Sequence, residues 1–330
     1  MKAWFIDDFK GIGGLRLAEV PDPVPRPDDV ILQVKYAALN PADRYLAENQ
    51  YPARPALPHI LGRDGLGTVV QLGSEVKNVR VGDRRAILRG ETGGNRPGTF
   101  AQFVAVPAQD LIEIPAGWSE SEAAGVTLVY LTACQALTMW GPLPPSAVVL
   151  VTGASGGVGA AAVQLASALG HKVVALSRSP EKTRRLEQMG ATTTYNPEDP
   201  RWSLTLKSTL APRRVDLAID NIGGKLLPQV IDTLNDLGRV SVVGRLAGPV
   251  PSFNTATLFF RRIRLGGVAV GAWTNAETRA AWREVLSLLS RTGARPQVDQ
   301  VFSFEQLPQA FDRLAQGPMG KVLLAVQPAG

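Results

Sequence analysis

The sequence predicts an α/β protein in which a barrel-like, mostly antiparallel β-domain is followed by a doubly wound domain with a parallel sheet. The chain has 330 residues, about twice the usual length of one domain. Its first third consists of short alternating runs between Pro and Gly residues. From about residue 120, apolar runs alternate with helical patterns. These three observations together predict the fold class.

Short strands are expected in the first third of the chain. The runs Asp29–Tyr36, Gly67–Gln71 and Ala101–Val106 are short, and turn-forming residues bound them. Runs of this kind are typical of antiparallel strands in a sandwich or barrel.

Strands and helices alternate in the middle of the chain. Continuous apolar runs are expected to form parallel strands that are buried on both faces, and the segments between them have helical length and spacing. The expected strands are 147–151, 172–176, 215–219 and 239–243, and the expected helices include 157–169 and 180–189.

The end of the chain has a different pattern. Past Gly271 the sequence predicts a helix at Ala276–Ser290 and a final strand at Lys321–Val326. Because this piece is too small to fold alone, we expect it to pack on the N-terminal domain. One domain is therefore predicted over residues 1–122 and 272–330, and a second over residues 123–271.

Composition excludes several classes of protein. The 35 basic and 29 acidic residues give a net charge of +6, a mild excess that does not predict nucleic-acid binding. One Cys and two His rule out a disulfide framework and offer few zinc ligands. No apolar stretch approaches the roughly 20 residues that cross a bilayer, and no signal-peptide pattern opens the chain. We expect a cytoplasmic protein with no nucleic-acid or membrane partner.

A glycine-rich turn follows the expected strand 147–151. Gly153 permits a tight turn, and Gly156 lets backbone N–H groups reach a pyrophosphate. Gly159 allows the next helix to pack closely on the strand. This strand–turn–helix context is the one that a dinucleotide-binding site needs. The residues of this turn that we assign to cofactor binding are Gly153, Ser155, Gly156, Gly157, Val158 and Gly159.

The second strand of this unit indicates which dinucleotide is bound. NAD enzymes carry an acidic residue at the end of that strand, where it binds the ribose 2′-hydroxyl. Here the strand ends in Ser177, Arg178 and Ser179, and Lys182 follows one turn later. Hydroxyl, guanidinium and ammonium groups suit a 2′-phosphate. NADPH is therefore the predicted cofactor.

Together with the domain order, several motifs resemble the medium-chain dehydrogenase/reductase superfamily, and most closely its zinc-free NADPH:quinone oxidoreductase branch, which includes zeta-crystallin-like proteins. The resemblance implies a GroES-like β-barrel catalytic domain and a Rossmann domain. The matching stretches run over nearly the whole chain: Leu39–Asp43, Pro58–Gly67, Val81–Arg84, Tyr130–Ala133, the glycine turn, Asp220–Gly224 and Gly320–Val322.

The resemblance also shows where zinc ligands are missing. Zinc-dependent members carry Cys where Asn40 stands and Gly-His-Glu where Gly62–Asp64 stands. An amide and a guanidinium in place of a thiolate and an imidazole predict that no divalent metal binds. His59 is expected to be a packed or surface residue, and Cys134 a small core residue.

The resemblance implies roles for further residues. Four are placed around the nicotinamide as catalytic candidates: Asn40, Tyr45, Tyr51 and Thr127. Four more are placed near the cofactor, with Tyr195 close to the adenosine phosphate: Tyr195, Asn221, Gly244 and Gly271. Phenol groups could donate a hydrogen bond to the oxygen of a quinone or enone as it gains charge.

The function predicted from these features is zinc-independent, NADPH-dependent reduction of a small-molecule quinone or activated alkene. Two alternatives remain open: an enoyl-thioester reductase of the same superfamily, and a non-catalytic NADPH-binding sensor or structural protein. The strand-forming stretch Arg264–Val270 would expose a sheet edge, which predicts a homodimer that pairs through this edge.

Overall fold

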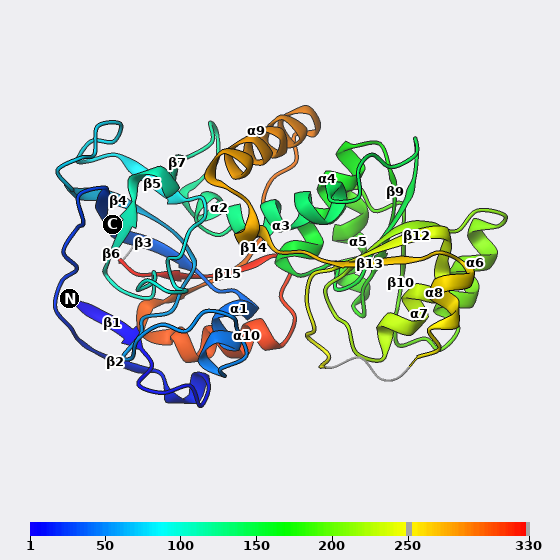
Figure 1. The fold of residues 1–330 in the computed structure, drawn as a ribbon, viewed down its shortest axis with the longest axis horizontal. Helices are drawn as coiled ribbons and strands as arrows, with labels where there is room; N and C mark the ends of the chain where they lie inside the picture. Colours follow the sequence, from blue (N-terminus) through cyan, green and yellow to red (C-terminus); the bar gives the residue numbers. More distant parts are fainter. Residues whose placement is uncertain (249–252, 328–330) are drawn as a thin grey trace. The chain divides into compact units, whose positions relative to one another are not determined.

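The chain folds as two units, which the computed structural model describes over residues 1–248 and 253–327 (Figure 1). Unit 1 contains Met1–Leu128, Thr274–Thr278 and Arg295–Gly330, and unit 2 contains Val129–Trp273 and Arg279–Ala294. The predicted domain boundaries at residues 122 and 272 stay a prediction. The two units differ from them chiefly because unit 2 takes most of the helix that begins at Asn275.

Unit 1 is built on a seven-stranded sheet in the order β14-β15-β3-β4-β5-β7, with β6 paired to β3. Every pairing in this sheet is antiparallel except that of β14 with β15. The strands are β3 (Asp29–Ala38), β4 (Asp64–Leu72), β5 (Arg84–Ile87), β6 (Phe103–Pro107), β7 (Leu111–Glu113), β14 (Val298–Ser303) and β15 (Lys321–Ala325). A separate antiparallel pair consists of β1 (Lys2–Phe5) and β2 (Arg16–Glu19).

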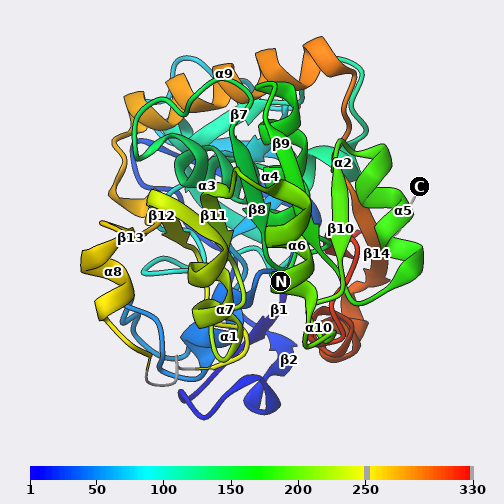
Figure 2. The same cartoon turned by 90° about the vertical axis from the view of Figure 1, so that its right-hand side faces the viewer.

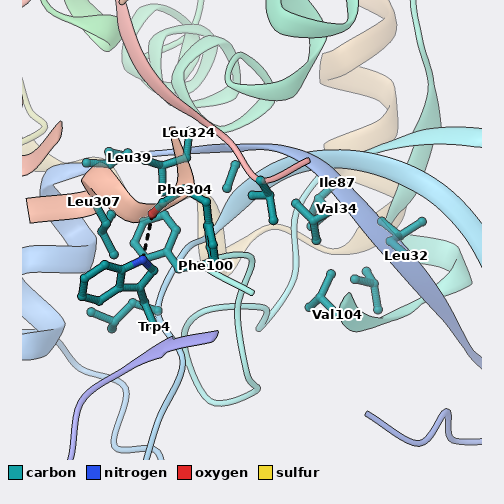
Figure 3. Close-up of a cluster of buried hydrophobic side chains, with 14 of the residues drawn as sticks. Trp4, Leu32, Val34, Leu39, Ile87, Phe100, Val104, Phe304, Leu307 and Leu324 are labelled. Carbon is teal, nitrogen blue, oxygen red and sulfur yellow. Dashed lines mark hydrogen bonds between the residues drawn. The ribbon is translucent and has the colours of Figure 1, made fainter. Parts of the chain in front are cut away.

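The centre of this sheet is β3, which pairs with β4, β6 and β15. Its apolar residues Val30, Leu32 and Val34 point into the core of unit 1, as alternation along a strand requires (Figure 3). Within this core, the indole Nε1 of Trp4 donates a hydrogen bond to the Phe304 carbonyl at 2.8 Å. The strands expected from the first third of the sequence are confirmed.

The helices of unit 1 are short. They are α1 (Pro41–Ala47), α2 (Glu120–Ala124) and α10 (Leu307–Ala315). Two further helices, α3 (Thr127–Thr138) and α9 (Asn275–Thr292), have residues in both units. Three residues define the N-terminus of α1. Asn40 is its N-cap, Pro41 is the first helical residue, and Asp43 completes a capping box.

Unit 2 is a doubly wound parallel sheet in the order β10-β9-β8-β11-β12-β13 (Figure 2). Its strands are β8 (Val148–Val151), β9 (Lys172–Leu176), β10 (Thr193–Tyr195), β11 (Val215–Asp220), β12 (Leu234–Val242) and β13 (Arg264–Gly267). The direction of winding reverses between the neighbours β8 and β11. Ligands of open α/β sheets bind at such a reversal, at the carboxyl ends of the strands.

Helices connect the strands of unit 2. They are α4 (Gly157–Ala168), α5 (Pro180–Gln188), α6 (Trp202–Leu210), α7 (Leu226–Thr233) and α8 (Ala256–Phe260). Trp202 of α6 and Val230 of α7 share one core with Leu150 of β8. The alternation of strands and helices expected from the sequence is confirmed, although β13 ends at Gly267, three residues before the expected end of its stretch. Among the described residues, no helix is both long and apolar enough to cross a bilayer.

Candidate functional site

A buried ion pair is the centre of the polar cluster in unit 1. The Nζ atom of Lys321 lies 3.3 Å from Oδ2 of Asp64, and these side chains are only 4% and 2% exposed. The same ammonium donates hydrogen bonds to the Leu39 carbonyl at 2.9 Å and to Oδ1 of Asn40 at 2.6 Å. The Asn40 amide in turn donates to Asp64 at 2.9 Å. Asn40, Asp64 and Lys321 therefore form a closed hydrogen-bonded ring.

Three neighbouring strands bring this ring together. Asp64 opens β4 and lies opposite Ala38, the last residue of β3. Lys321 opens β15, which pairs with the same end of β3. Asn40 follows β3 as the N-cap of α1. Residues that are far apart in sequence meet because the sheet places these three strand ends side by side.

The catalytic candidates differ in how available their polar groups are. Asn40 is 3% exposed and uses its amide within the ring, and Thr127 is 1% exposed and donates its hydroxyl to the Ile87 carbonyl at 2.7 Å. Tyr45 and Tyr51 are partly exposed. Among the described residues, the Tyr51 hydroxyl has no hydrogen-bond partner, and its ring lies 5.0 Å from the guanidinium carbon of Arg63. The geometry gives Asn40 and Thr127 positioning contacts and leaves the Tyr51 hydroxyl available.

Asp43 adds a titratable group beside this ring. Burial raises the pKa of its carboxyl to about 7, and the hydrogen bond from the Asn40 backbone N–H and the charges of Arg63 and Lys321 oppose the rise. One oxygen accepts that N–H at 2.8 Å, and the other has no partner among the described residues. At neutral pH the carboxyl is therefore close to its midpoint of titration.

His59 and Cys134 do not provide an alternative site. His59 is buried, and burial lowers the pKa of its imidazole to about 4. Burial also raises the pKa of the Cys134 thiol to about 11, so this thiol is a poor nucleophile. No group of three or more His, Cys, Asp or Glu side chains in the described parts of the chain is arranged to hold a metal ion.

The glycine turn of unit 2 fits a dinucleotide. Gly153 has φ +56°, which favours glycine. A Cβ on Gly159 would lie 2.2 Å from the Gly153 carbonyl oxygen, whereas one on Gly156 would meet its nearest atom at 3.5 Å. Gly156 is the N-cap of α4, and Ser155, Gly157 and Val158 beside it are partly exposed. The turn therefore packs tightly and directs a helix N-terminus outward, as pyrophosphate binding requires.

A second buried network joins the strand ends at the reversal of unit 2. Oδ1 of Asp220, at the end of β11, accepts the Thr152 hydroxyl at 2.7 Å, and the Asn221 amide donates to the Thr152 carbonyl at 2.7 Å. The Asn221 Oδ1 atom is buried and has no partner among the described residues. Gly244 packs against this network, since a Cβ there would lie 2.8 Å from the Asn221 carbonyl oxygen. Gly271 is exposed and makes no such close approach.

The residues predicted to bind the 2′-phosphate gather at the end of β9. Ser179 is the N-cap of α5 and accepts the Lys182 backbone N–H. The Ser177 backbone N–H bonds to the Tyr195 carbonyl at 3.0 Å. Arg178 is 66% exposed, and its guanidinium lies 3.6 Å from Glu198. Two hydroxyls and two cationic side chains therefore surround one strand end, with Glu198 as a competing anion.

Several residues of these clusters are not predicted from the sequence. Sequence reasoning does not assign three of them to a site: Lys321, Asp43 and Thr152. It also does not predict the partners of Asp64 and Asp220. Lys321 and Asp220 stand at the ends of apolar runs, and a charge in such a place is a usable signal of a buried partner. The sequence does not identify that partner, because it comes from a distant strand.

Fold and site together define an oxidoreductase with a dinucleotide-binding unit. The alcohol dehydrogenase GroES-like domain model matches residues 26–116, and the zinc-binding dehydrogenase model matches residues 157–291. The two models together match more than half of the chain, which belongs to the medium-chain dehydrogenase/reductase superfamily, and several of its curated relatives are named quinone oxidoreductases.

The relatives carry different names. Quinone oxidoreductase of Sus scrofa is 27% identical, with 98% of this chain and 97% of that protein covered. A zinc-type alcohol dehydrogenase-like protein of Schizosaccharomyces pombe is 28% identical, with 97% of each covered. A solved NAD-dependent alcohol dehydrogenase has a TM-score of 0.89 at 28% identity, over 99% of this chain and 100% of that one. Cofactor and metal dependence therefore have to be argued from the residues.

Removing the Lys321 ammonium should destabilise unit 1. In Lys321→Met the Asp64 carboxylate stays buried without its counter-charge, which typically costs about 3–5 kcal/mol. Urea unfolding should show this loss. The double variant Lys321→Met/Asp64→Asn removes both charges and should recover most of the stability. If the double variant is as unstable as the sum of its single changes, the pair is not coupled.

Asp43 should make stability fall as pH rises. Its folded pKa of about 7 lies above the ordinary Asp value, so the folded state retains a proton that the unfolded state has lost. The stability that this proton provides is complete below about pH 4 and is lost as pH rises through 7. Asp43→Asn keeps an acceptor oxygen for the cap and should gain thermal stability relative to wild type at about pH 8 but not at about pH 4. His59, with its lowered pKa, has the opposite slope and is common to both proteins. A stability difference that does not vary with pH would contradict this assignment.

Proposed function

We propose that this protein is a zinc-independent, NADPH-dependent reductase of quinones or activated alkenes. The observation that carries the proposal is the buried ring of Asn40, Asp64 and Lys321. By the family resemblance, Asn40 and Arg63 stand where zinc-dependent members have the Cys and His ligands, and Asp64 stands where they have Glu. Here an ammonium group already satisfies the amide and the carboxylate, and a cation beside it disfavours a divalent metal.

The loss of the metal sets the direction of the chemistry. A dehydrogenase without zinc lacks its usual means of lowering the pKa of an alcohol. Reduction of an already electrophilic carbon needs no such help, because the bound nicotinamide supplies a hydride. The chain has to orient the acceptor and donate hydrogen bonds to the oxygen that gains charge. Tyr45 and Tyr51 are the side chains proposed for that donation, and a proton from solvent completes the two-electron reduction.

NADPH is proposed over NADH on the residues at the end of β9. Ser177, Ser179, Arg178 and Lys182 offer hydroxyls and positive charge. None of residues 176–179, which end the strand, is acidic, although Glu198 lies 3.6 Å from Arg178. In the same proposal, the glycine turn binds the pyrophosphate, and Asn221, Gly244 and Gly271 lie along the cofactor with Tyr195 near its adenosine end. A carboxylate at the strand end would favour a free 2′-hydroxyl instead.

Reductase activity is tested by NADPH oxidation with 1,2-naphthoquinone, a simple enone and crotonyl-CoA. We expect turnover with the first two.

The variants Tyr45→Phe and Tyr51→Phe keep the ring and remove the hydroxyl. The kcat of each variant should fall by up to about 10²–10³. The fall should be larger for the enone than for the quinone, and KM should change little. If both single variants and the double variant keep the wild-type kcat, the tyrosines have a structural role and not a catalytic one. Turnover of crotonyl-CoA alone would indicate an enoyl-thioester reductase. The absence of turnover with all three substrates would indicate a non-catalytic binding protein.

Cofactor selectivity should depend on Arg178. Losing one charged hydrogen bond to phosphate costs roughly 1.5–3 kcal/mol, so Arg178→Ala should weaken NADPH binding at least about tenfold and leave NADH nearly unchanged. Glu198→Gln should do the reverse and tighten NADPH, because it releases Arg178 from its ion pair. Dissociation constants from cofactor fluorescence give both values. An equal loss for NADPH and NADH in Arg178→Ala would contradict the assignment.

We further propose a cytoplasmic homodimer that pairs through β13. This strand is the edge of the parallel sheet, and edges with unpaired backbone groups favour pairing. Beside it, Phe259 and Phe260 of α8 are 64% and 78% exposed, with ring centroids 4.4 Å apart. Light scattering should return twice the chain mass of 35.2 kDa. A mass of one chain at micromolar concentration would refute the dimer.

A further inference from the structure

Arg63 is a partly buried cation without a carboxylate partner. It lies between the strictly buried residues Gly62 and Asp64 at the start of β4. Its guanidinium carbon is 5.0 Å from the centroid of the Tyr51 ring. Among the described residues it forms no ion pair and no hydrogen bond. The ring therefore supports the cation but leaves the hydrogen-bonding edges of the guanidinium unused.

Three other partly buried arginines of unit 1 are paired with carboxylates. Arg85 contacts Asp83 at 2.7 Å, and Arg313 contacts Asp299 through two 2.7 Å hydrogen bonds. Arg96 pairs with the buried Asp29. A partly desolvated guanidinium is costly to leave without an acceptor. Arg63 is an exception to the pattern that these three residues show.

The nearby carboxylates do not pair with Arg63. Asp64 accepts from Lys321 and Asn40. Asp43 accepts the Asn40 backbone N–H, and it interacts with Arg63 only through the electrostatic field. Two permanent cations, Arg63 and Lys321, therefore face one fully engaged carboxylate and one carboxyl that burial tends to protonate. The cluster has a surplus of positive charge next to Tyr51, a proposed catalytic side chain.

Two glycines near Arg63 constrain the position of this residue. Gly62 has φ +102°, and a Cβ there would lie 2.5 Å from Oγ1 of Thr99. Gly94 faces the guanidinium, and a Cβ on it would lie 3.4 Å from Nη1 of Arg63. A larger residue at either position would displace the arginine or its support. A positioned planar fork of N–H groups is suited to binding a carboxylate through two hydrogen bonds.

We propose that Arg63, stacked on Tyr51, binds an anionic group of the substrate, so that the preferred acceptors are enones or quinones that carry a carboxylate. This inference rests on the proposed reductase function and specifies its substrate class. Arg63 would act in substrate binding, beside the tyrosine hydroxyl that meets the reacting oxygen.

The test compares an acid with its neutral ester. Wild-type protein should reduce 4-oxo-2-pentenoate with a higher kcat/KM than its methyl ester, using NADPH. Arg63→Met should lower kcat/KM for the acid about tenfold or more, mainly through KM, and leave the ester nearly unchanged. Arg63→Lys, which keeps the charge but loses the fork, should retain part of the preference.

A matched control separates this effect from net charge. Arg44→Met removes one exposed arginine that is already paired with Glu48 at 2.6 Å, and it should leave the acid-to-ester ratio unchanged. If Arg63→Met changes acid and ester by the same factor, or if Arg44→Met lowers the ratio equally, Arg63 is not an anion-binding residue. Thermal unfolding of each variant confirms that the protein is folded.

A binding measurement separates this inference from the proposed function. If wild-type protein reduces neither compound nor 1,2-naphthoquinone, the reductase proposal is wrong. Calorimetric titration with 4-oxopentanoate and its methyl ester then decides the role of Arg63 without turnover. The acid should bind about tenfold or more weakly to Arg63→Met than to wild type. Equal affinities would overturn the inference.

Discussion

The organisation of unit 1 depends on the buried contact between Lys321 and Asp64. Taking both charges out of water carries a large desolvation penalty, which their attraction offsets only if the remaining hydrogen-bonding positions are filled. Here the Leu39 carbonyl and the Asn40 amide fill them. The pair therefore ties the start of β15, the end of β3 and the start of β4 to one point. It also gives Asn40 a single amide orientation, because one end of the amide accepts and the other donates.

Unit 2 also buries a carboxylate, and there neutral donors form its hydrogen bonds. Asp220 is fully buried and receives the Thr152 hydroxyl and backbone N–H groups of Ile222 and Gly223. These bonds hold the ends of β8 and β11 together at the reversal of winding. Asn221 then presents a buried oxygen without a protein partner. Each unit thus has a hydrogen-bonded polar centre with an unused polar group beside it, such as the Asn221 Oδ1 atom in unit 2 and the Arg63 guanidinium in unit 1.

Charge decides what these unused groups can bind. In unit 1 the excess is positive, and Asp43 buffers it, because its raised pKa lets it gain or lose a proton near neutrality. At the end of β9, Arg178 is shared between Glu198 and the space where a 2′-phosphate is proposed to bind. At the end of β9 the proposed selectivity is a competition between an internal carboxylate and an external anion, whereas Arg63 has no carboxylate partner among the described residues. The arginines, rather than the tyrosines proposed to be catalytic, are therefore the residues at which specificity should be easiest to change.

The sequence alone predicted the fold class, several strands of each unit, the helices α4, α5 and α9 and the glycine turn, since these depend on local periodicity and on glycine geometry over a few residues. The family resemblance of the sequence also indicated which residues stand in place of the zinc ligands of zinc-dependent members. Only the tertiary structure decided the contacts of those residues: that Lys321 reaches Asn40 and Asp64 across 281 and 257 positions, and that Arg63 stacks on Tyr51 without an acid. Such pairings were unpredictable, because a buried charge needs some partner, but its identity depends on which distant strand ends the sheet brings together.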